Sequence, residues 1–436
     1  MKNFFSPLLS FLTRFSFISF RALLFTAVCC SCVITAANAQ QMDSVSYEKY
    51  KFIDLSKNKI ENDSSALSSF YQNLLLLEEK KNKRVNITHI GDSHIQADIF
   101  SGTIRQHLQL KFGNAGRGLI FPYRVAKSNE PGSYKTTSGT KWDAKRNVFY
   151  DKPLPIGISG FTIETNDSSA EIDLAVKNQP GLDYSFTKFT LFHERGLSNY
   201  DITICDSINC EQGIFKSSDK SNNPFVSELK FEKPMRQIIL RNKNTDTAHQ
   251  HSTRIYGMLL ENDSAGVLYN MIGVNGAEYR HYTKSKYFME QLTYLQSSLV
   301  IISMGTNEGF NKGFDKDLFY KQIDSLVLAI RITNPSASVI LTTPGDSFRK
   351  SRKGRVKNPD IKLVEATIIT YCKNNNLSYW DLYEIMGGYG SMAKWYTAKL
   401  SAADRVHFNG NGYKLQANLF YDALMSGYEK YRKNKS

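Results

Sequence analysis

The sequence has few cysteines and no apolar run long enough to favour a membrane-spanning helix. Six cysteines occur in 436 residues, and the eight histidines are scattered, so nothing indicates a metal site. The apolar stretch 22–35 is too short to span a bilayer. The glycine-dense loop 113–118 follows a predicted helix, and no Gly-Lys-Ser comes after it, unlike a nucleotide-binding loop. The sequence therefore predicts no metal, no cofactor and no membrane span in the mature chain.

The first 39 residues have the pattern of a secretory signal peptide. The leader is rich in aromatic residues and carries three positive charges, at Lys2, Arg14 and Arg21. An apolar core follows at 22–35, and Ala37-Asn38-Ala39 then forms a small-x-small cleavage site. We expect cleavage before Gln40 and an exported, periplasmic or secreted protein. An uncleaved anchor is the alternative. A lipid-modified cysteine is a weaker one, since no cysteine of the leader has a leucine-x-small approach.

Acidic residues are in deficit, and the formal net charge is +14. Removing the leader would take away three of these positive charges. No basic motif is interleaved with aromatic residues, so nucleic acid is not expected as a partner. A basic exported protein is suited to anionic envelope glycans or membrane surfaces, although the lysines could equally serve solubility alone.

Three cysteines remain after the predicted cleavage. Cys205 and Cys210 flank four residues between two predicted strands, and in an oxidising compartment they could form a disulfide. Such a bond would act locally, because it closes a short loop. Cys372 lies in a predicted helix with apolar neighbours and is expected to be a small core residue.

The length favours more than one domain, and the pattern of apolar and polar residues changes along the chain. Residues 129–262 contain short alternating runs between clusters of Gly, Asn, Asp and Ser, which predict an antiparallel β-sandwich. The predicted runs are Gly160–Thr165, Ala170–Val176, Phe186–Phe192, Tyr200–Cys205, Phe225–Phe231, Arg236–Arg241 and Arg254–Leu260. We therefore divide the chain into a signal peptide (1–39), an N-terminal helical segment (40–84), a first part (85–128), the inserted sandwich (129–262) and a second part (263–436).

The two parts around the insertion alternate between apolar strands and amphipathic helices, which is typical of a parallel sheet covered on both faces. Residues 282–295 are predicted to form one helix, and the basic segment 346–357 is predicted to be a mobile surface loop. The other predicted elements are strands at 85–91, 299–303, 338–342 and 378–382 and helices at 67–80, 99–112, 317–332, 360–373 and 411–431.

Four short blocks carry the chemistry. They are Gly91-Asp92-Ser93 after the first apolar strand, Gly273-Val274-Asn275-Gly276, Gly305-Thr306-Asn307 after a second strand, and Asp404-Arg405-Val406-His407 before the last helix. Serine, glycine, asparagine and histidine in this order resemble the SGNH (GDSL-type) hydrolase family. The resemblance covers 85–112 and about 265–428 and implies a three-layer α/β fold. With the insertion, the chain resembles bacterial peptidoglycan O-acetylesterases that carry a carbohydrate-module-like β-domain.

The resemblance implies a role for each block. Ser93 would be the nucleophile, His407 its base, and Asp404 the group that orients the histidine. The oxyanion hole would consist of the N–H groups of Ser93 and Gly276 and the amide of Asn307, with Gly273 as an alternative to Gly276.

Three neighbours of these residues do not carry the chemistry in this reading. Asp92 is expected to cap the turn after the first strand, and His94 to line the pocket. Glu308 stands where the family more often has aspartate, which could change how the Asn307 loop is held.

The predicted function is that of an exported serine esterase that removes O-acetyl groups from a cell-envelope glycan, with acetylated polysaccharide or peptidoglycan as its partner. Alternatives on the same triad are a lipid or thioester hydrolase and an O-acyltransferase. A non-catalytic glycan-binding or assembly protein is a further alternative, which the retention of Ser93, Asp404 and His407 disfavours. The sequence sets neither the glycan nor the oligomeric state.

Overall fold

The computed structural model describes residues 47–149, 154–206, 210, 212–219, 225–352 and 354–435. The predicted signal peptide and its cleavage site lie outside these residues. Tyr47–Ser436 forms one compact unit. The proposed division at 128/129 and 262/263 therefore remains a proposal about domains, although the texture of the chain does change there, as the strands below show.

A six-stranded sheet forms the centre of the α/β part, in the order β1-β19-β16-β15-β2-β14. All neighbours are parallel except β1, which runs antiparallel to β19. Every residue of β14 and β16 is buried, as expected for strands with helices on both faces. The strands are β1 (Ile60–Glu61), β2 (Arg84–Gly91), β14 (Gly266–Gly273), β15 (Leu299–Ser303), β16 (Ser338–Thr342) and β19 (Ser378–Trp380).

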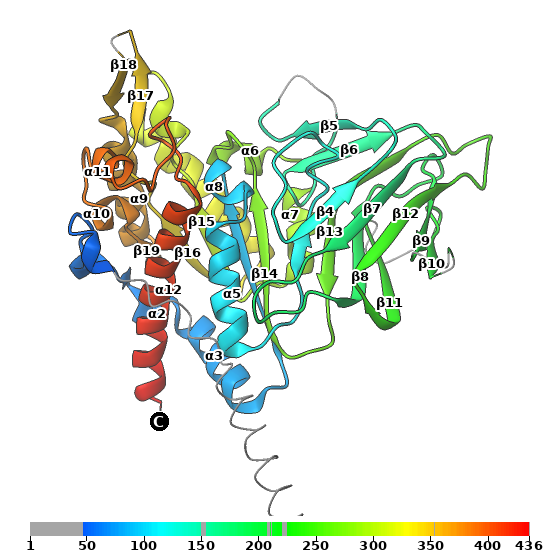
Figure 1. The fold of residues 1–436 in the computed structure, drawn as a ribbon, viewed down its shortest axis with the longest axis horizontal. Coiled ribbons are helices and arrows are strands. Elements are labelled where there is room, and N and C mark those ends of the chain that lie inside the picture. The colour runs from blue at the N-terminus through cyan, green and yellow to red at the C-terminus, as the bar shows by residue number, and fades with distance from the viewer. Residues whose placement is uncertain are drawn as a thin grey trace, which may run out of the picture. The chain divides into compact units, whose positions relative to one another are not determined.

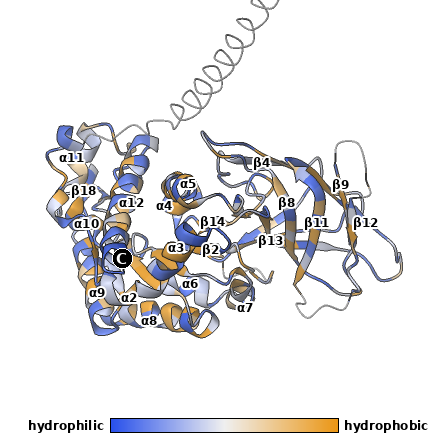
Figure 2. Cartoon of the chain, turned by 90° about the horizontal axis from the view of Figure 1, so that it is seen from below, coloured by the Kyte–Doolittle hydropathy of each residue, from blue (hydrophilic) through white to orange (hydrophobic). Residues whose placement is uncertain are grey.

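Helices cover both faces of this sheet. α5 (Phe100–Phe112) packs on α12 (Gly410–Lys433), and α8 (Lys316–Thr333) packs on α9 (Asp360–Asn374); Figure 2 shows the two pairs on opposite sides. Each helix buries one apolar stripe. The other helices are α2 (Asp63–Ala66), α3 (Ser68–Lys80), α4 (Ser93–Gln96), α6 (Tyr279–Thr283), α7 (Phe288–Leu292), α10 (Leu382–Ile385) and α11 (Met392–Thr397), with 3-10 turns at Tyr47–Lys49, Leu55–Lys57, Thr293–Leu295 and Glu308–Phe310.

Two antiparallel sheets lie beside the α/β part (Figure 1). Their orders are β10-β9-β12-β7-β4 and β11-β8-β13-β6-β5, with β3 (Gly118–Ile120) paired to β13. All seven predicted runs are strands. These runs correspond to β6 (Phe161–Thr165), β7 (Glu171–Val176), β8 (Phe186–His193), β9 (Asp201–Cys205), β11 (Val226–Met235), β12 (Gln237–Lys243) and β13 (Thr253–Glu261). The two sheets also contain β4 (Tyr134–Thr137), β5 (Asp143–Arg146) and β10 (Gly213–Phe215), which were not predicted.

The two antiparallel sheets pack through apolar side chains that alternate along their strands. Phe189 of β8 stacks on Phe215 of β10 at 6.2 Å between ring centroids, which joins one sheet to the other. Cys205 and Cys210 form a disulfide at the end of β9, which the sequence had left open, and Cys372 is a buried free cysteine. The predicted fold class, a parallel α/β sheet interrupted by an antiparallel sandwich, is confirmed.

The single helix predicted for 282–295 is wrong. The chain forms α6 and α7 with a break between them, followed by a 3-10 turn. Within the break, the Ser285 hydroxyl donates to the carbonyl of His281, and the N–H of Tyr287 donates to Ile156 in the segment before β6. A tertiary hydrogen bond thus replaces the helical one, which periodicity along the chain cannot reveal.

The segment 346–357, predicted to be a loop, contains an antiparallel hairpin. β17 (Phe348–Ser351) pairs antiparallel with β18 (Gly354–Lys357), and Asp346 before it is fully buried. Asp346 accepts from the N–H of Met392, which ties the start of the hairpin to α11. The basic composition suggested a solvated loop, but the ends of the segment are held by residues far along the chain.

A buried ionic cluster joins α5 to the antiparallel sheets. The Asp98 carboxylate lies 2.7 Å from the guanidinium groups of both Arg105 and Arg117. Arg105 also donates to the hydroxyl of Tyr184, and Arg117 to that of Ser133. Burial disfavours the charge of Asp98, but the two arginines outweigh burial and hold its pKa below the usual value. The cluster makes the insertion part of the folded unit.

Among the residues that the structure describes, no helix is both long and apolar enough to cross a membrane.

Candidate active site

The carboxyl ends of three parallel strands bring the predicted blocks to one edge of the sheet. Gly91 at the end of β2 pairs with Gly273 of β14 on one side and with Ser303 of β15 on the other. Ser93, Gly276 and Asn307 follow these strands within two to four positions. Open α/β sheets bind ligands at this edge, so the fold alone accounts for the meeting of three blocks that are far apart in sequence.

Ser93 sits on a tight turn between β2 and α4. A Cβ added to Gly91 would lie 2.2 Å from a side-chain carbon of Ile95, so only glycine lets the helix start this close to the strand. Asp92 is buried, and its carboxylate accepts from the N–H of His94 at 2.9 Å. The predicted capping role of Asp92 is therefore what the structure has. The turn presents the Ser93 hydroxyl beyond the end of the strand.

Ser93, His407 and Asp404 form a continuous line of hydrogen bonds. Ser93 Oγ lies 2.8 Å from His407 Nε2, and His407 Nδ1 lies 2.7 Å from Asp404 Oδ2. The other carboxylate oxygen of Asp404 accepts from the N–H groups of Val406 and His407, each at 3.0 Å. This geometry lets His407 take a proton from Ser93 while Asp404 stabilises the charged ring.

The surroundings of Asp404 favour the ionised form of its carboxylate. Its partial burial opposes ionisation, but the hydrogen bonds from the His407 ring and from the two backbone N–H groups outweigh this effect and lower the pKa of Asp404. The hairpin β17–β18 holds the same loop from outside. Arg355 donates to the carbonyl of Asp404 at 2.5 Å, and the N–H of Phe348 donates to the carbonyl of Arg405 at 2.9 Å.

A hollow of about 560 Å³ opens over the nucleophile. It is large enough for a sugar residue with its acyl group and leaves the serine accessible to a substrate carbonyl. The lining residues include all the predicted site residues except Asp404, which lies behind the histidine. They are Ser93, Asn129, Asn275, Gly276, Thr306, Asn307, Phe310, Val406 and His407.

The three expected oxyanion donors face this hollow. The N–H of Ser93 is the first of a helix and so has no helical acceptor. Gly276 lies in a turn at φ 84°, which favours glycine, and within the described part of the chain its N–H has no protein acceptor. Gly273, the alternative, is the last residue of β14 and does not line the hollow. The geometry therefore favours Gly276 over Gly273.

The side-chain amide of Asn307 makes one short hydrogen bond and one long contact. Its Nδ2 atom donates to the carbonyl of Ala277 at 2.8 Å, whereas its contact with Asp92 Oδ2 is long, at 3.4 Å. The Ala277 bond fixes the plane of the amide. The second N–H is then free to strengthen its interaction when negative charge develops on a substrate oxygen.

Asn307→Ala should lower kcat by about 10²- to 10³-fold with little change in KM, because the lost hydrogen bond forms mainly in the transition state. Steady-state kinetics on an activated acetyl ester would measure this effect. Asn311→Ala, which alters an amide close by in the chain, serves as the matched control. A loss confined to KM would instead make Asn307 a group that binds the ground state.

Glu308, the departure from the family pattern, holds the Asn307 loop to α6. Its carboxylate is buried and accepts from the N–H of Tyr279, the first residue of that helix, at 2.8 Å. Burial raises the pKa of Glu308 to about 8. Burial likewise raises the pKa of Asp92 to about 7. Glu308 therefore tends to keep its proton at neutral pH, whereas Asp92 is divided between its two protonation states.

We expect the contribution of Glu308 to the free energy of unfolding to fall as the pH rises from 4.5 to about 8, because over this range the unfolded chain releases the Glu308 proton and the folded chain keeps it. Glu308→Gln should remove this contribution, so that across this range the free energy of unfolding of the variant falls less with pH than that of the wild type. Urea unfolding at several pH values, with the exposed Glu290→Gln as control, would measure it. An unchanged slope in the Glu308 variant would show that the carboxyl ionises normally.

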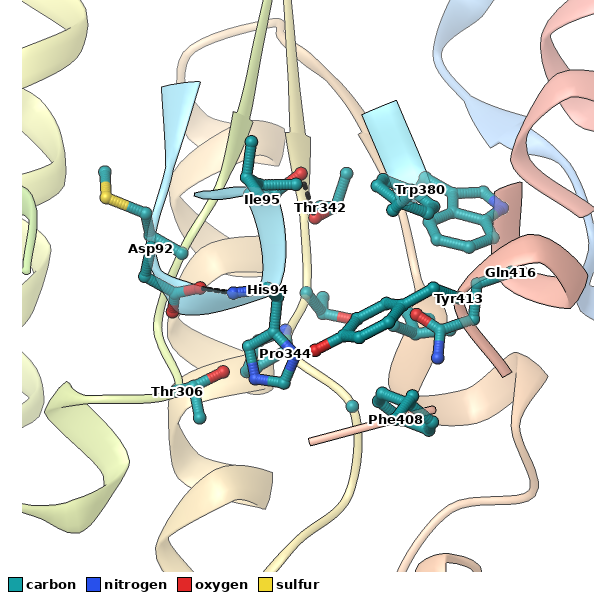
Figure 3. A pocket seen from close by; sticks show the side chains of 16 residues that line it. Asp92, His94, Ile95, Thr306, Thr342, Pro344, Trp380, Phe408, Tyr413 and Gln416 are labelled. Atoms are coloured by element: carbon teal, nitrogen blue, oxygen red, sulfur yellow. Dashed lines mark hydrogen bonds between the residues drawn. The ribbon is translucent and has the colours of Figure 1, made fainter. Parts of the chain in front are cut away.

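His94 lies behind the triad histidine and not beside the nucleophile. Its ring stacks on His407 at 5.0 Å between centroids, and its Nδ1 atom lies 3.0 Å from the hydroxyl of Tyr413. Figure 3 shows the side chains of His94 and Tyr413 meeting beside a small cavity. The volume of this cavity is about 40 Å³. Burial lowers the pKa of His94 to about 3, followed by the effect of His407. His94 is therefore a neutral ring that supports His407 from behind; it lines this small cavity and not the hollow over the nucleophile, where it was expected.

The sequence did not reveal the side chain that ties the oxyanion turn to the neighbouring segment. Gln96 accepts from the N–H of Asn275 at 2.7 Å and donates to the Ser128 hydroxyl at 2.7 Å. It lies three positions after Ser93 on α4. Its place inside the helix gave no sign of these contacts, because they join it to residues that are distant in sequence.

Within the described ranges, no group of three or more His, Cys, Asp or Glu side chains has a metal-binding arrangement. His249 and His251, the closest histidine pair in the sequence, are exposed. His249 instead pairs with Asp246 at 2.7 Å.

Comparison with known proteins agrees with this geometry. Residues 243–415 match the GDSL-like lipase/acylhydrolase family. This range contains Gly276, Asn307, Asp404 and His407, whereas Ser93 reaches the site through the pairing of β2 with β14 and β15. No curated protein matches the chain.

Among solved structures, a peptidoglycan O-acetylesterase matches with a TM-score of 0.71 and 21% identity, over 85% of this chain and 99% of its own. An acetyl xylan esterase, AlAXEase, matches with a TM-score of 0.30 and 19% identity, over 37% and 82% of the two chains. A mutant family two carbohydrate esterase from Clostridium thermocellum matches with a TM-score of 0.29 and 12% identity, over 66% and 98%. The last two scores are too low to carry an argument.

The first match extends over the antiparallel sheets as well as the α/β part, because it covers more of the chain than the α/β part alone could supply. The family match and the arrangement of the four blocks support an ester hydrolase. The resemblance to the SGNH (GDSL-type) hydrolases is thereby confirmed: the chain has their fold and resembles a peptidoglycan O-acetylesterase in its whole architecture.

Proposed function

We propose that the protein is an exported carbohydrate O-acetylesterase that removes acetyl groups from a cell-envelope glycan, with peptidoglycan as the first candidate. The observation that carries this proposal is the hydrogen-bonded line Ser93–His407–Asp404 opening into the hollow with the three oxyanion donors. The similarity in fold to a peptidoglycan O-acetylesterase supports the choice of glycan.

The proposed reaction has two halves. Ser93 Oγ attacks the ester carbonyl while His407 Nε2 takes its proton, and the oxyanion is held by Ser93, Gly276 and Asn307. His407 then returns the proton to the departing sugar oxygen, which leaves an acetyl group on Ser93. Water attacks this acyl-enzyme with His407 again as base, and acetate is released.

A short acyl group suits the hollow better than a long chain. Its lining includes the polar side chains of Asn129, Asn275, Thr306 and Asn307. A lipid hydrolase would need an apolar tunnel for the chain, because each buried CH₂ contributes about 0.8 kcal/mol. The apolar side chains of the lining are Phe310 and Val406, which provide contact for an acetyl methyl, and the polar side chains between them interrupt any continuous apolar tunnel.

Substrate profiling tests this function. We expect purified mature protein to release acetate from O-acetylated peptidoglycan and to prefer acetyl esters over octanoyl esters of the same alcohol. Ser93→Ala protein is the control for spontaneous hydrolysis. A preference for octanoyl esters, or acetyl transfer to an added sugar in place of acetate release, would replace the proposal with a lipid hydrolase or a transferase.

A further inference from the structure

Basic side chains line two further hollows, and some residues that line them are neighbours in sequence of a residue that lines the catalytic hollow. Asn129 lines the catalytic hollow, and the two residues before it, Ser128 and Lys127, line a second hollow of about 180 Å³ together with residues of β5. Lys127 also lines a third hollow of about 390 Å³. We call the basic residues of the last two hollows the basic strip: Arg124, Lys127, Lys141, Lys145 and Arg146.

The position of the basic strip relative to the nucleophile is fixed by the fold. Gln96 of the catalytic helix α4 donates to the Ser128 hydroxyl while it accepts from Asn275 of the oxyanion turn. On the other side, a Cβ added to Gly276 would lie 4.0 Å from a methyl of Val148, two positions after Arg146. Both edges of the second hollow are thus tied to the groups that would hold the scissile ester.

The positive charges of the strip are largely uncompensated. Among the described residues, no carboxylate forms a salt bridge with Lys127, Lys141, Lys145 or Arg146. Arg124 lies 3.4 Å from Glu130, whose carboxylate also accepts from the N–H of Thr136. From 124 to 146 the sequence has six basic residues and two acidic ones. The strip therefore places an excess of positive charge around the two hollows.

The second hollow also has an apolar surface. Phe149 is 47% exposed, and the Arg146 guanidinium lies 4.6 Å from the centroid of its ring. This contact pre-orders both side chains at the rim of the hollow. A cation beside an exposed aromatic ring is suited to a ligand that carries carboxylates on sugar rings, since the ring offers an apolar contact and the cation a charge-assisted hydrogen bond.

We propose that the basic strip is a subsite for the carboxylate groups of an acetylated glycan strand whose ester lies at Ser93. This inference rests on the proposed function for the identity of the strand. It adds that the substrate is anionic beyond the ester, so that the enzyme discriminates carboxylate-bearing glycans from neutral ones. Contacts on the strip would hold the strand across the hollows while the acetyl group enters the oxyanion hole.

The test compares kcat/KM on fragments of O-acetylated peptidoglycan, which carry free carboxylates, with kcat/KM on neutral acetylated xylo-oligosaccharide. In Lys127→Gln/Arg146→Gln protein we expect the ratio of the two values to fall about tenfold or more, and the wild-type ratio to fall as salt is added. Lys135→Gln is the matched control, because Lys135 is an exposed lysine of β4 that lines neither hollow.

A second variant pair, Lys141→Gln/Lys145→Gln, repeats the test without disturbing the Arg146–Phe149 contact. Thermal unfolding of each variant verifies that it is folded. A ratio that stays at the wild-type value in both double variants would overturn the subsite.

Direct binding separates failure of the subsite from failure of the proposed function. Calorimetry with Ser93→Ala protein and de-acetylated peptidoglycan fragments should show affinity that the strip variants lose. If no glycan is hydrolysed but this pattern holds, the proposed function fails and the subsite stands. If the fragments bind equally with and without the strip, or if only phosphatidylglycerol vesicles lose binding in the strip variants, the subsite is overturned and the vesicle result assigns the charge to a membrane surface.

Discussion

Ser93→Ala protein should fold normally and lose turnover of an activated acetyl ester by about 10⁴- to 10⁶-fold, because the variant lacks the only hydroxyl in hydrogen-bond contact with His407 among the described residues. The side chain is half-buried on a turn, and its removal leaves the cap by Asp92 in place. Initial rates with 4-nitrophenyl acetate measure the effect. Ser168→Ala, at an exposed serine between β6 and β7, is the control.

His407→Ala should be similarly severe, and combining it with Ser93→Ala should add little, because members of a triad act as a unit. Losses that multiply in the double variant would show that the two side chains act independently. Activity near wild type in the Ser93 variant would place the nucleophile elsewhere.

Asp98→Asn should produce the largest loss of stability, about 3–5 kcal/mol, because it leaves Arg105 and Arg117 buried without a carboxylate. All three side chains are at most 2% exposed. Asparagine keeps the shape of the side chain and tolerates the left-handed backbone at this position, where φ is 54°. The loss can therefore be attributed to the missing charge.

Urea unfolding compares this variant with Asp183→Asn, which removes an exposed carboxylate paired with Arg236 at 3.0 Å. We expect the exposed pair to contribute less than about 1 kcal/mol. In the wild type, the stabilisation from Asp98 is present at neutral pH and is lost as the pH falls through its lowered pKa, below 3.8. Similar effects of the two variants would show that the buried cluster is not a major source of stability.

The buried cluster also affects how the insertion can be studied. Arg117 and Asp98 precede residue 129, but Tyr184 and Ser133, which complete their hydrogen bonds, lie within 129–262. Removing the insertion would leave two arginines and a carboxylate only partly satisfied in what remains. Point variants of the basic strip are therefore a cleaner way to examine the role of this region than excision.

The sequence predicted most of what depends on local signals. The apolar strand before Ser93, the glycine of the turn and the helix after it are neighbours in the chain, and parallel strands necessarily bring their carboxyl ends to one edge. For this reason Ser93, Gly276 and Asn307 could be expected at one edge of the sheet, whereas His407, which precedes α12, was assigned to the site through the resemblance to the SGNH hydrolases. The seven predicted runs of the antiparallel sheets likewise rested on alternation within each strand.

What the sequence could not predict depends on contacts between distant segments. The hydrogen bond from Tyr287 to Ile156 breaks the helix expected at 282–295. Phe348 and Arg355, in the hairpin that forms where a loop was expected, donate hydrogen bonds to the triad loop. Asp98 and Arg117 gave no sign of their pairing, because charged residues are usually solvated. In each case a contact with a residue distant in sequence produced a structure that the local pattern did not predict.

The central claim is that Ser93, activated by His407, forms a covalent intermediate. A fluorophosphonate reagent, which reacts with activated serines, tests it most directly when the labelled residue is mapped by peptide mass spectrometry. The account predicts one label per chain, on the peptide that contains Ser93, with loss of esterase activity in proportion to labelling and no label in the His407→Ala variant. A label on another residue, or full activity after Ser93 is completely labelled, would contradict it.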